Sequence, residues 1–316
     1  MIYDLIILGI GPAGLAAALY AERSKLNTLL VGKQVGGYVV ETPLIENYPG
    51  FKEISGMDLA KKMYEQVQAI DIKIEEEILE IKEVENEFVI KTNKDTYLGK
   101  TLILALGSKR RELGIKGEQE FKGKGITYCV LCDAPFFKDK DVAIIGGGDS
   151  AVIAALLMLK YANKIYMIDI EKKPRAKAFR LEQLKKEGKE KLEILSSHKV
   201  NEIKGKEFVN AIEIEEVEWQ DKEFKETGQK KELPIQGIII EIGMTPSTEL
   251  VKQLDIKLDG GGFIVVDEEM KTNIKGIFAA GDITNRKLKQ ILTAAAQGAT
   301  AAISAQDYIQ EIKKRK

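Results

Sequence analysis

The chain contains little cysteine, histidine or tryptophan. Its 316 residues include two cysteines, one histidine and one tryptophan, and its net charge is −1 at pH 7. So small a charge gives no field that would attract nucleic acid or an anionic membrane surface, and neither is expected as a partner. No apolar run approaches the roughly 18 residues of a membrane span. The composition is that of a globular protein, and the length predicts about two domains of roughly 150 residues each.

The start of the chain is apolar but lacks the features of a secretory signal. It has no basic segment, it contains Asp4, and glycines interrupt its apolar run. Two cysteines without an export signal indicate a reducing compartment, where a close cysteine pair usually serves redox or metal chemistry. We therefore expect a cytoplasmic protein.

The two cysteines, Cys129 and Cys132, are separated by two residues and followed at once by Asp133. Such a pair can cycle between dithiol and disulfide, and the carboxyl group can transfer protons to or from a thiol. A zinc site is disfavoured because zinc needs four ligands and the chain adds only His198. Two inert, buried cysteines are the other alternative, and the spacing argues against them. Cys129, Cys132 and Asp133 are the predicted catalytic residues.

Two segments have the strand, glycine loop, helix and strand of a nucleotide-binding βαβ unit. The first has strands at 3–8 and 28–31 and a helix at 12–22; the second has strands at 141–145 and 164–168 and a helix at 151–161. Their separation predicts an α/β fold with two Rossmann-like, three-layer nucleotide-binding domains.

Two similar apolar strands, 102–107 and 238–243, each end in glycine, and we interpret both exits as crossovers between domains. The second domain is then inserted in the first. The predicted boundaries are 1–112 with 247–316 for the discontinuous domain and 113–246 for the inserted one.

The first glycine loop offers backbone N–H groups and a helix N-terminus to a pyrophosphate, although an ordinary tight turn is the alternative. Its cofactor-binding candidates are Gly9, Gly11, Pro12, Ala13 and Gly14. The next strand ends in Gly32 and Lys33, where an acid would usually hold the ribose. We expect the backbone from Lys33 to Tyr38 to make those contacts.

The second glycine loop contributes Gly146, Gly148, Asp149 and Ser150 as candidates. The strand that follows ends in Asp169, and a carboxylate there binds the 2′-hydroxyl of NAD and repels the 2′-phosphate of NADP. Arg175 follows closely enough to attract a phosphate, and a solvated run of charges is the alternative interpretation. The acid favours NADH over NADPH.

With these motifs the chain resembles the low-molecular-weight thioredoxin reductases over essentially its whole length. The matching segments are the first glycine loop, Gly36–Gly37, 46–50, 129–133, 146–151, 276–282 and 289–291. The resemblance implies FAD at the first loop, with Gly281 and Asp282 at its ribityl–pyrophosphate region. It places Asn47, Gln290 and the neighbouring Gly37, Tyr38, Lys289 and Ile291 near the flavin.

The resemblance also implies a direction of electron flow. Cys132 would face the flavin, Cys129 would attack the disulfide of a thioredoxin-like protein, and Asp133 would be the acid–base group. A homodimer is implied as well. Because the cysteine pair and the nicotinamide belong to one domain and both need the flavin, we predict a domain rotation, with hinges near 109–113 and 243–246.

The sequence departs from the family at Tyr38, at Lys289 and Ile291, and most strongly at 169–175, where only Arg175 remains of the arginines that hold the NADPH 2′-phosphate. The electron donor is therefore open between NADH and ferredoxin or a reduced deazaflavin. A flavin-bound redox sensor without turnover is an alternative from another class. His198 and Trp219 carry no functional prediction; Trp219 is expected to mark a hairpin.

Overall fold

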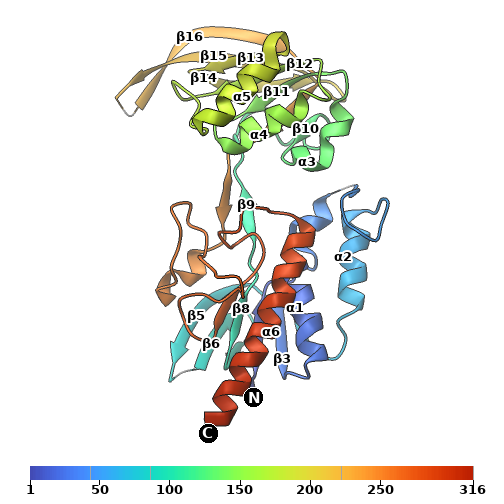
Figure 1. Cartoon of the computed structure of the whole chain (residues 1–316), viewed down its shortest axis with the longest axis vertical. Helices are drawn as coiled ribbons and strands as arrows, with labels where there is room; N and C mark the ends of the chain where they lie inside the picture. The colour runs from blue at the N-terminus through green and yellow to red at the C-terminus, as the bar shows by residue number, and fades with distance from the viewer. Residues whose placement is uncertain (43, 86, 222, 316) are drawn as a thin grey trace. The chain divides into compact units, whose positions relative to one another are not determined.

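The computed structural model of the protein describes residues 1–42, 44–85, 87–221 and 223–315. The chain forms two compact units, which are drawn in Figure 1. The discontinuous unit consists of Met1–Lys109 and Thr245–Lys316, and the inserted unit consists of Arg110–Met244. The chain changes units a few residues before each of the boundaries that we expected from the sequence.

The discontinuous unit is built on a five-stranded parallel sheet of order β19-β8-β2-β3-β4 and a four-stranded sheet of order β1-β7-β6-β5. Its elements are β1 (Ile2–Tyr3), β2 (Leu5–Leu8), α1 (Pro12–Arg23), β3 (Thr28–Gly32), η1 (Gly37–Glu41), α2 (Gly56–Glu65), β4 (Asp71–Ile74), β5 (Ile78–Val84), β6 (Glu87–Thr92), β7 (Thr96–Gly99), β8 (Leu102–Leu104), η4 (Glu249–Leu254), β19 (Ile277–Ala279) and α6 (Ile291–Arg315).

The centre of this unit follows from its apolar strands and small helical residues. Every residue of β2 is buried, as a central parallel strand covered on both faces requires. Pro12 occupies the first turn of α1, where its missing N–H costs nothing. Helices α1 and α6 lie side by side (Figure 1), and a Cβ on Gly298 of α6 would stand 2.0 Å from the Ala13 carbonyl oxygen of α1. Glycine is therefore required where the two helices meet.

The inserted unit has a five-stranded parallel sheet of order β10-β17-β11-β12-β13 and a three-stranded antiparallel sheet of order β14-β15-β16. Its elements are β10 (Ile126–Thr127), α3 (Val130–Asp133), η2 (Ala134–Phe137), β11 (Asp141–Ile145), α4 (Asp149–Met158), β12 (Lys164–Asp169), α5 (Ala178–Gly188), η3 (Lys189–Lys191), β13 (Leu192–Ser196), β14 (His198–Gly205), β15 (Val209–Gln220), β16 (Glu223–Pro234) and β17 (Gly237–Ile240).

Alternate residues of β11 face two separate cores in the inserted unit. Val142 and Ile144 pack with the apolar side chains of α4, whereas Ala143 and Ile145 pack with the β14-β15-β16 sheet. A helical layer, a parallel sheet and an antiparallel sheet are thus stacked, since successive side chains of a strand point to opposite faces. The α/β class predicted from the sequence is confirmed.

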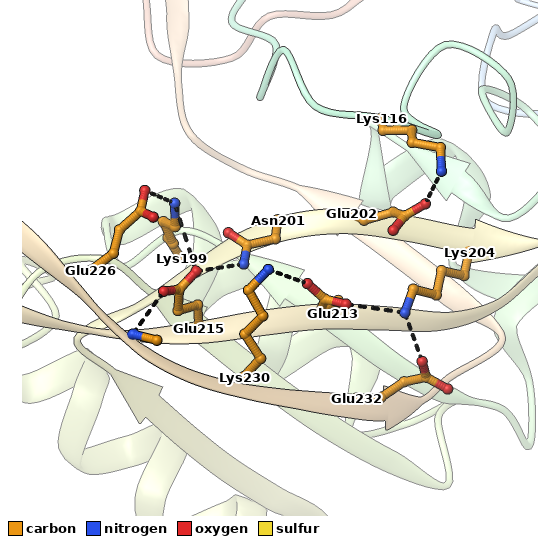
Figure 2. Close-up of polar contacts among 11 residues, drawn as sticks. Lys116, Lys199, Asn201, Glu202, Lys204, Glu213, Glu215, Glu226, Lys230 and Glu232 are labelled. Carbon is orange, nitrogen blue, oxygen red and sulfur yellow. Dashed lines mark hydrogen bonds and ion pairs between the residues drawn. The ribbon is translucent and has the colours of Figure 1, made fainter.

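The antiparallel sheet carries a network of lysine and glutamate side chains, shown in Figure 2. Lys204 Nζ lies 3.1 Å from a Glu213 carboxylate oxygen and 2.9 Å from one of Glu232, and Lys230 Nζ lies 3.2 Å from Glu213. Opposite charges on neighbouring strands favour one register over a slipped one. The network therefore helps to fix the pairing of the long strands β15 and β16.

The two crossovers between the units pair with each other. Strands β9 (Ser108–Arg110) and β18 (Met244–Pro246) form a two-stranded sheet. Its flanks are closed by the Arg111 N–H, which donates to the Gly243 carbonyl at 3.1 Å, and by the Ser247 N–H, which donates to the Gly107 carbonyl at 3.1 Å. The predicted crossover segments are thus hydrogen-bonded to one another.

Candidate active site

Cys129 and Cys132 form a disulfide, with their Cα atoms 5.3 Å apart. Cys129 immediately precedes the short helix α3, and its carbonyl oxygen accepts hydrogen bonds from the N–H groups of Cys132 (3.0 Å) and Asp133 (3.1 Å). This tight turn brings the two sulfur atoms together. Both cysteines are half-buried, so the pair is held by the fold and remains open to chemistry.

Thr127 links Asp133 to the disulfide. Its hydroxyl donates to Asp133 Oδ2 and accepts a hydrogen bond from the Cys129 N–H at 3.0 Å. Thr127 is itself buried and belongs to β10, which pairs with β17 in the parallel sheet. The acid–base candidate is therefore oriented by Thr127, which is not among the residues predicted from the sequence. Its position two residues before the cysteine pair is the only signal for it in the sequence.

A buried carboxylate supports the residue that precedes Cys129. Glu118 is 1% exposed and accepts hydrogen bonds from the Tyr128 hydroxyl (2.7 Å) and from the N–H groups of Leu113 (2.9 Å) and Gly114 (2.7 Å). Burial, with the hydrogen bond to Glu118, raises the pKa of Tyr128. Glu118 thereby fastens the segment after the first crossover to the segment that enters the cysteine pair.

The two glycine loops have the same backbone geometry at their first glycine. Gly9 has φ +108° and Gly146 has φ +127°, in the region that favours glycine. A Cβ at either position would stand within 2.4 Å of a carbonyl oxygen after the neighbouring strand, that of Ala105 for Gly9 and that of Glu241 for Gly146. The similar strands seen in the sequence therefore serve the same purpose, each closing one side of a glycine loop.

Asp169 turns towards the second glycine loop. It is 3% exposed, and its Oδ2 would lie only 1.6 Å from a Cβ on Gly147. Oδ1 accepts a long hydrogen bond from the Glu171 N–H at 3.4 Å, but no donor among the described residues reaches Oδ2. Burial raises the pKa of Asp169. A buried carboxylate oxygen without a donor is costly, and a ligand hydroxyl would satisfy it.

The arginines around this loop are paired with carboxylates. Arg175 lies 3.5 Å from Glu171, and Arg180 lies 2.9 Å from Asp149. Asp149 also accepts a hydrogen bond from the Lys177 N–H at 2.9 Å, which together with Arg180 lowers its pKa. Asp149 and Ser150 lie in the first turn of α4, although we expected the helix to begin at 151; an acid there is favoured by the helix dipole.

The glycine candidates of the discontinuous unit gather at its first loop. A Cβ on Gly32 would lie 3.3 Å from Gly9 Cα, one on Gly37 would lie 3.6 Å from Gly11 Cα, and one on Gly281 would lie 3.0 Å from Ala13 Cβ. No atom of the described chain lies within 4 Å of a Cβ built on Gly11, at the N-cap of α1. A pyrophosphate fits this open backbone, where the N–H groups of a helix end favour an anion.

The remaining candidates of this unit form two contacts. Asn47 Nδ2 donates to Gln290 Oε1 at 3.2 Å, which joins two residues implied to lie near the flavin. Lys289 is largely buried, which lowers its pKa, and its ammonium donates to the carbonyl oxygens of Asp282 (3.0 Å) and Thr284. Lys289 thus holds the backbone of the loop that contains Asp282.

Three candidates stand at the margins of these contacts. Lys33 is exposed directly after β3, Tyr38 is 53% exposed in η1, and Ile291 begins α6 and packs with Val39 and its neighbours.

None of the described helices is long and apolar enough to cross a membrane. Within the same residues, no group of three or more histidine, cysteine or acidic side chains is arranged to hold a metal ion.

Comparisons with known proteins agree with this arrangement. The family model for pyridine nucleotide-disulphide oxidoreductases matches residues 3–298. The thioredoxin reductase of Listeria monocytogenes is 39% identical over 99% of this chain and 95% of its own. The crystal structure of thioredoxin reductase from Streptococcus pyogenes is 36% identical, with a TM-score of 0.86 over 98% of this chain and 99% of that one.

A further solved structure has a lower TM-score. The ferredoxin-flavin thioredoxin reductase from Clostridium acetobutylicum is 30% identical, with a TM-score of 0.52 over 98% of this chain and 99% of that one. From the family match over residues 3–298 and these similarities, the chain belongs to the pyridine nucleotide-disulphide oxidoreductases, among the low-molecular-weight thioredoxin reductases.

Proposed function

We propose that this protein is an FAD-dependent thioredoxin reductase that takes its electrons from NADH. The observation that carries the proposal is the Cys129–Cys132 disulfide, held beside Asp133 in the same unit as a dinucleotide-type glycine loop. The pairing of a dithiol with two nucleotide loops is the arrangement of a relay. Family membership supports FAD and a pyridine nucleotide as the two cofactors.

A bound flavin would supply two-electron transfer between the dinucleotide and the disulfide. The open backbone at Gly11 and the helix N-terminus of α1 would hold its pyrophosphate. The loop that contains Asp282, held by Lys289, would bind the ribityl–pyrophosphate region. The hydrogen-bonded pair of Asn47 and Gln290 would lie against the ring.

The choice of NADH rests on the charges around Asp169. Its unpaired Oδ2 can accept a hydrogen bond from a ribose 2′-hydroxyl, and a 2′-phosphate offers no such donor. Arg175 and Arg180, the arginines available to a phosphate, are paired with Glu171 and Asp149. A 2′-phosphate would therefore meet a carboxylate and find its cationic partners engaged.

The cysteine pair performs the last transfer in this proposal. Two electrons and two protons would convert the Cys129–Cys132 disulfide to a dithiol, with Cys132 on the flavin side. The Cys129 thiol would then attack the disulfide of a thioredoxin-like protein and form a mixed disulfide, releasing one partner sulfur as a thiol. Cys132 would displace the other, which re-forms the Cys129–Cys132 disulfide and frees the reduced partner. Asp133, oriented by the Thr127 hydroxyl, gives a proton to the departing thiolate and takes one from the attacking thiol. The rotation of the inserted unit between two working states remains a prediction from the sequence.

Anaerobic stopped-flow absorbance tests the donor. The FAD-loaded protein is mixed with NADH, NADPH or reduced ferredoxin, and bleaching of the flavin is followed. We expect NADH to bleach the flavin at a lower concentration than NADPH, and oxidised thioredoxin to restore the colour. Absence of bleaching by NADH in large excess would refute the donor, and bleached flavin that no thioredoxin reoxidises would refute the acceptor.

One specific observation favours a second donor. The family arginines are absent at Ile170 and Glu171, and a related structure is that of a ferredoxin-flavin thioredoxin reductase. Bleaching by reduced ferredoxin alone would support this alternative. The flavin sensor without turnover requires that every donor fail to drive thioredoxin reduction. We further propose a cytoplasmic homodimer, which light scattering of the purified protein would test.

A further inference from the structure

The single tryptophan of the chain contacts the loop that follows Asp169. The Trp219 indole Nε1–H donates to the Ile170 carbonyl oxygen at 2.7 Å, across 49 residues of sequence. An indole N–H is a donor only, so this bond fixes both the ring and the backbone carbonyl. Trp219, which carried no functional prediction from the sequence, therefore contacts the segment that contains the proposed nucleotide-selecting acid, Asp169.

A second connection joins the same strand to the next residue of the loop. The Val217 N–H donates to the Ser197 carbonyl at 2.8 Å, and the Ser197 N–H donates to the Glu171 carbonyl at 2.9 Å. Strand β15 thus holds two consecutive loop carbonyls, one through Trp219 and one through Ser197.

The far end of the loop is held by the glycine loop itself. The Ala176 N–H donates to the Gly147 carbonyl at 3.0 Å, and Asp169 packs on Gly147 at the other end. The loop is therefore tied at both ends by Gly147 and in its middle by β15. Trp219 is supported in turn by Phe224, its partner across the hairpin, with ring centroids 5.6 Å apart.

We propose that Trp219 is a positioning residue for nucleotide recognition: it holds the Asp169–Glu171 loop in the form that accepts the ribose hydroxyls of NADH. The inference rests on the proposed function, because it assigns the dinucleotide to this loop. Binding to a loop that is already ordered loses less conformational freedom than binding to a loose one. The unpaired Oδ2 of Asp169 is the acceptor that this order keeps in place.

Trp219→Phe tests the proposal, because it keeps an aromatic ring against Phe224 and removes the indole donor. We expect the KM for NADH and the Kd for NAD⁺ to rise about fivefold, as the loss of one neutral hydrogen bond predicts. The kcat at saturating NADH and the KM for thioredoxin should not change. Phe208→Leu, at the exposed turn between β14 and β15, is the matched control and should change neither nucleotide constant.

A second measurement does not require a donor or a thioredoxin. Hydrogen–deuterium exchange of the amides at 170–173 and 175–177 in nucleotide-free protein should be about fivefold faster in Trp219→Phe than in the wild type or in Phe208→Leu. Unchanged exchange would overturn the positioning role. Faster exchange with unchanged NADH constants would overturn the link to nucleotide binding. If NADH neither bound to the wild-type protein nor reduced its flavin, the proposed donor would be refuted, and with it the ligand proposed for this loop.

Discussion

The contact between Gly147 and Asp169 makes a sharp prediction for Gly147→Ala. The new Cβ would stand 1.6 Å from Asp169 Oδ2 and 2.3 Å from its Cγ, far inside van der Waals contact. The backbone of Gly147 is outside the left-handed region, so strain comes from this contact alone. Because Asp169 is 3% exposed, its carboxyl group cannot move aside without displacing neighbours.

Overpacking of this kind costs about 1–3 kcal/mol. At about 4 °C for each kcal/mol in a unit of this size, the melting temperature of Gly147→Ala should fall by roughly 4 to 12 °C. The displaced carboxyl group should also weaken NADH binding. Differential scanning calorimetry and nucleotide titration measure the two effects.

Two further variants decide whether the contact is the cause. Gly148→Ala is the control, because no described atom lies within 4 Å of its added Cβ and φ is −84°; it should cost less than about 1 kcal/mol. Asp169→Ala in the Gly147→Ala background removes the clashing oxygens and should recover most of the lost stability. If the double variant melted as low as Gly147→Ala, or if Gly148→Ala cost as much, the reasoning would be wrong.

Three other predictions concern separate parts of the inserted unit. Thr127→Val removes the donor to Asp133 and should lower kcat for disulfide reduction roughly tenfold or more, whereas Thr127→Ser should stay near wild type. Ferricyanide reduction by the flavin should not change in Thr127→Val. An equal loss in both assays would contradict a role for Thr127 at the disulfide. Burial raises the pKa of Glu241 from 4.5 to about 7, so the folded state binds more protons and wild-type stability falls as pH rises through this window. Denaturation from about pH 5 to about pH 8 should show that Glu241→Gln removes this fall, on the order of 3 kcal/mol, and a parallel pH profile would refute it. Glu213→Gln breaks the contacts with Lys204 and its neighbours (Figure 2) and should lower the melting temperature in dilute buffer, with a smaller difference at about 1 M salt; a difference independent of salt would count against an ionic origin.

The elements that could be predicted from the sequence are those fixed by local pattern. The runs at β2 and β11 are continuous and apolar because both faces of a central parallel strand are covered. Each is followed by a glycine loop and a helix, so the two nucleotide-binding units followed from short segments. The cysteine pair was equally local, and its disulfide is confirmed.

The features that could not be predicted depend on residues distant in sequence. Nothing in the sequence near Trp219 indicates Ile170, and the two meet only because β15 folds back over the carboxyl end of β12. Asp169 was selected as a ribose ligand from its position after a strand, but its contact with Gly147 requires the packed loop. The sequence around Glu118 does not distinguish it from a surface glutamate, because its three hydrogen-bond donors come together only in the folded chain.

The paired crossovers have a consequence for how this chain can be rearranged. Because β9 and β18 are hydrogen-bonded neighbours, the first and last residues of the inserted unit lie next to each other. When the two ends of a segment are adjacent, removing, replacing or circularly permuting that segment requires no long linker. Joining Lys109 directly to Thr245 would then connect adjacent backbone ends, and Arg110–Met244 carries its own cores. The cysteine pair and the second glycine loop are therefore carried together on one continuous segment with adjacent ends, whereas the predicted flavin-binding residues lie outside it.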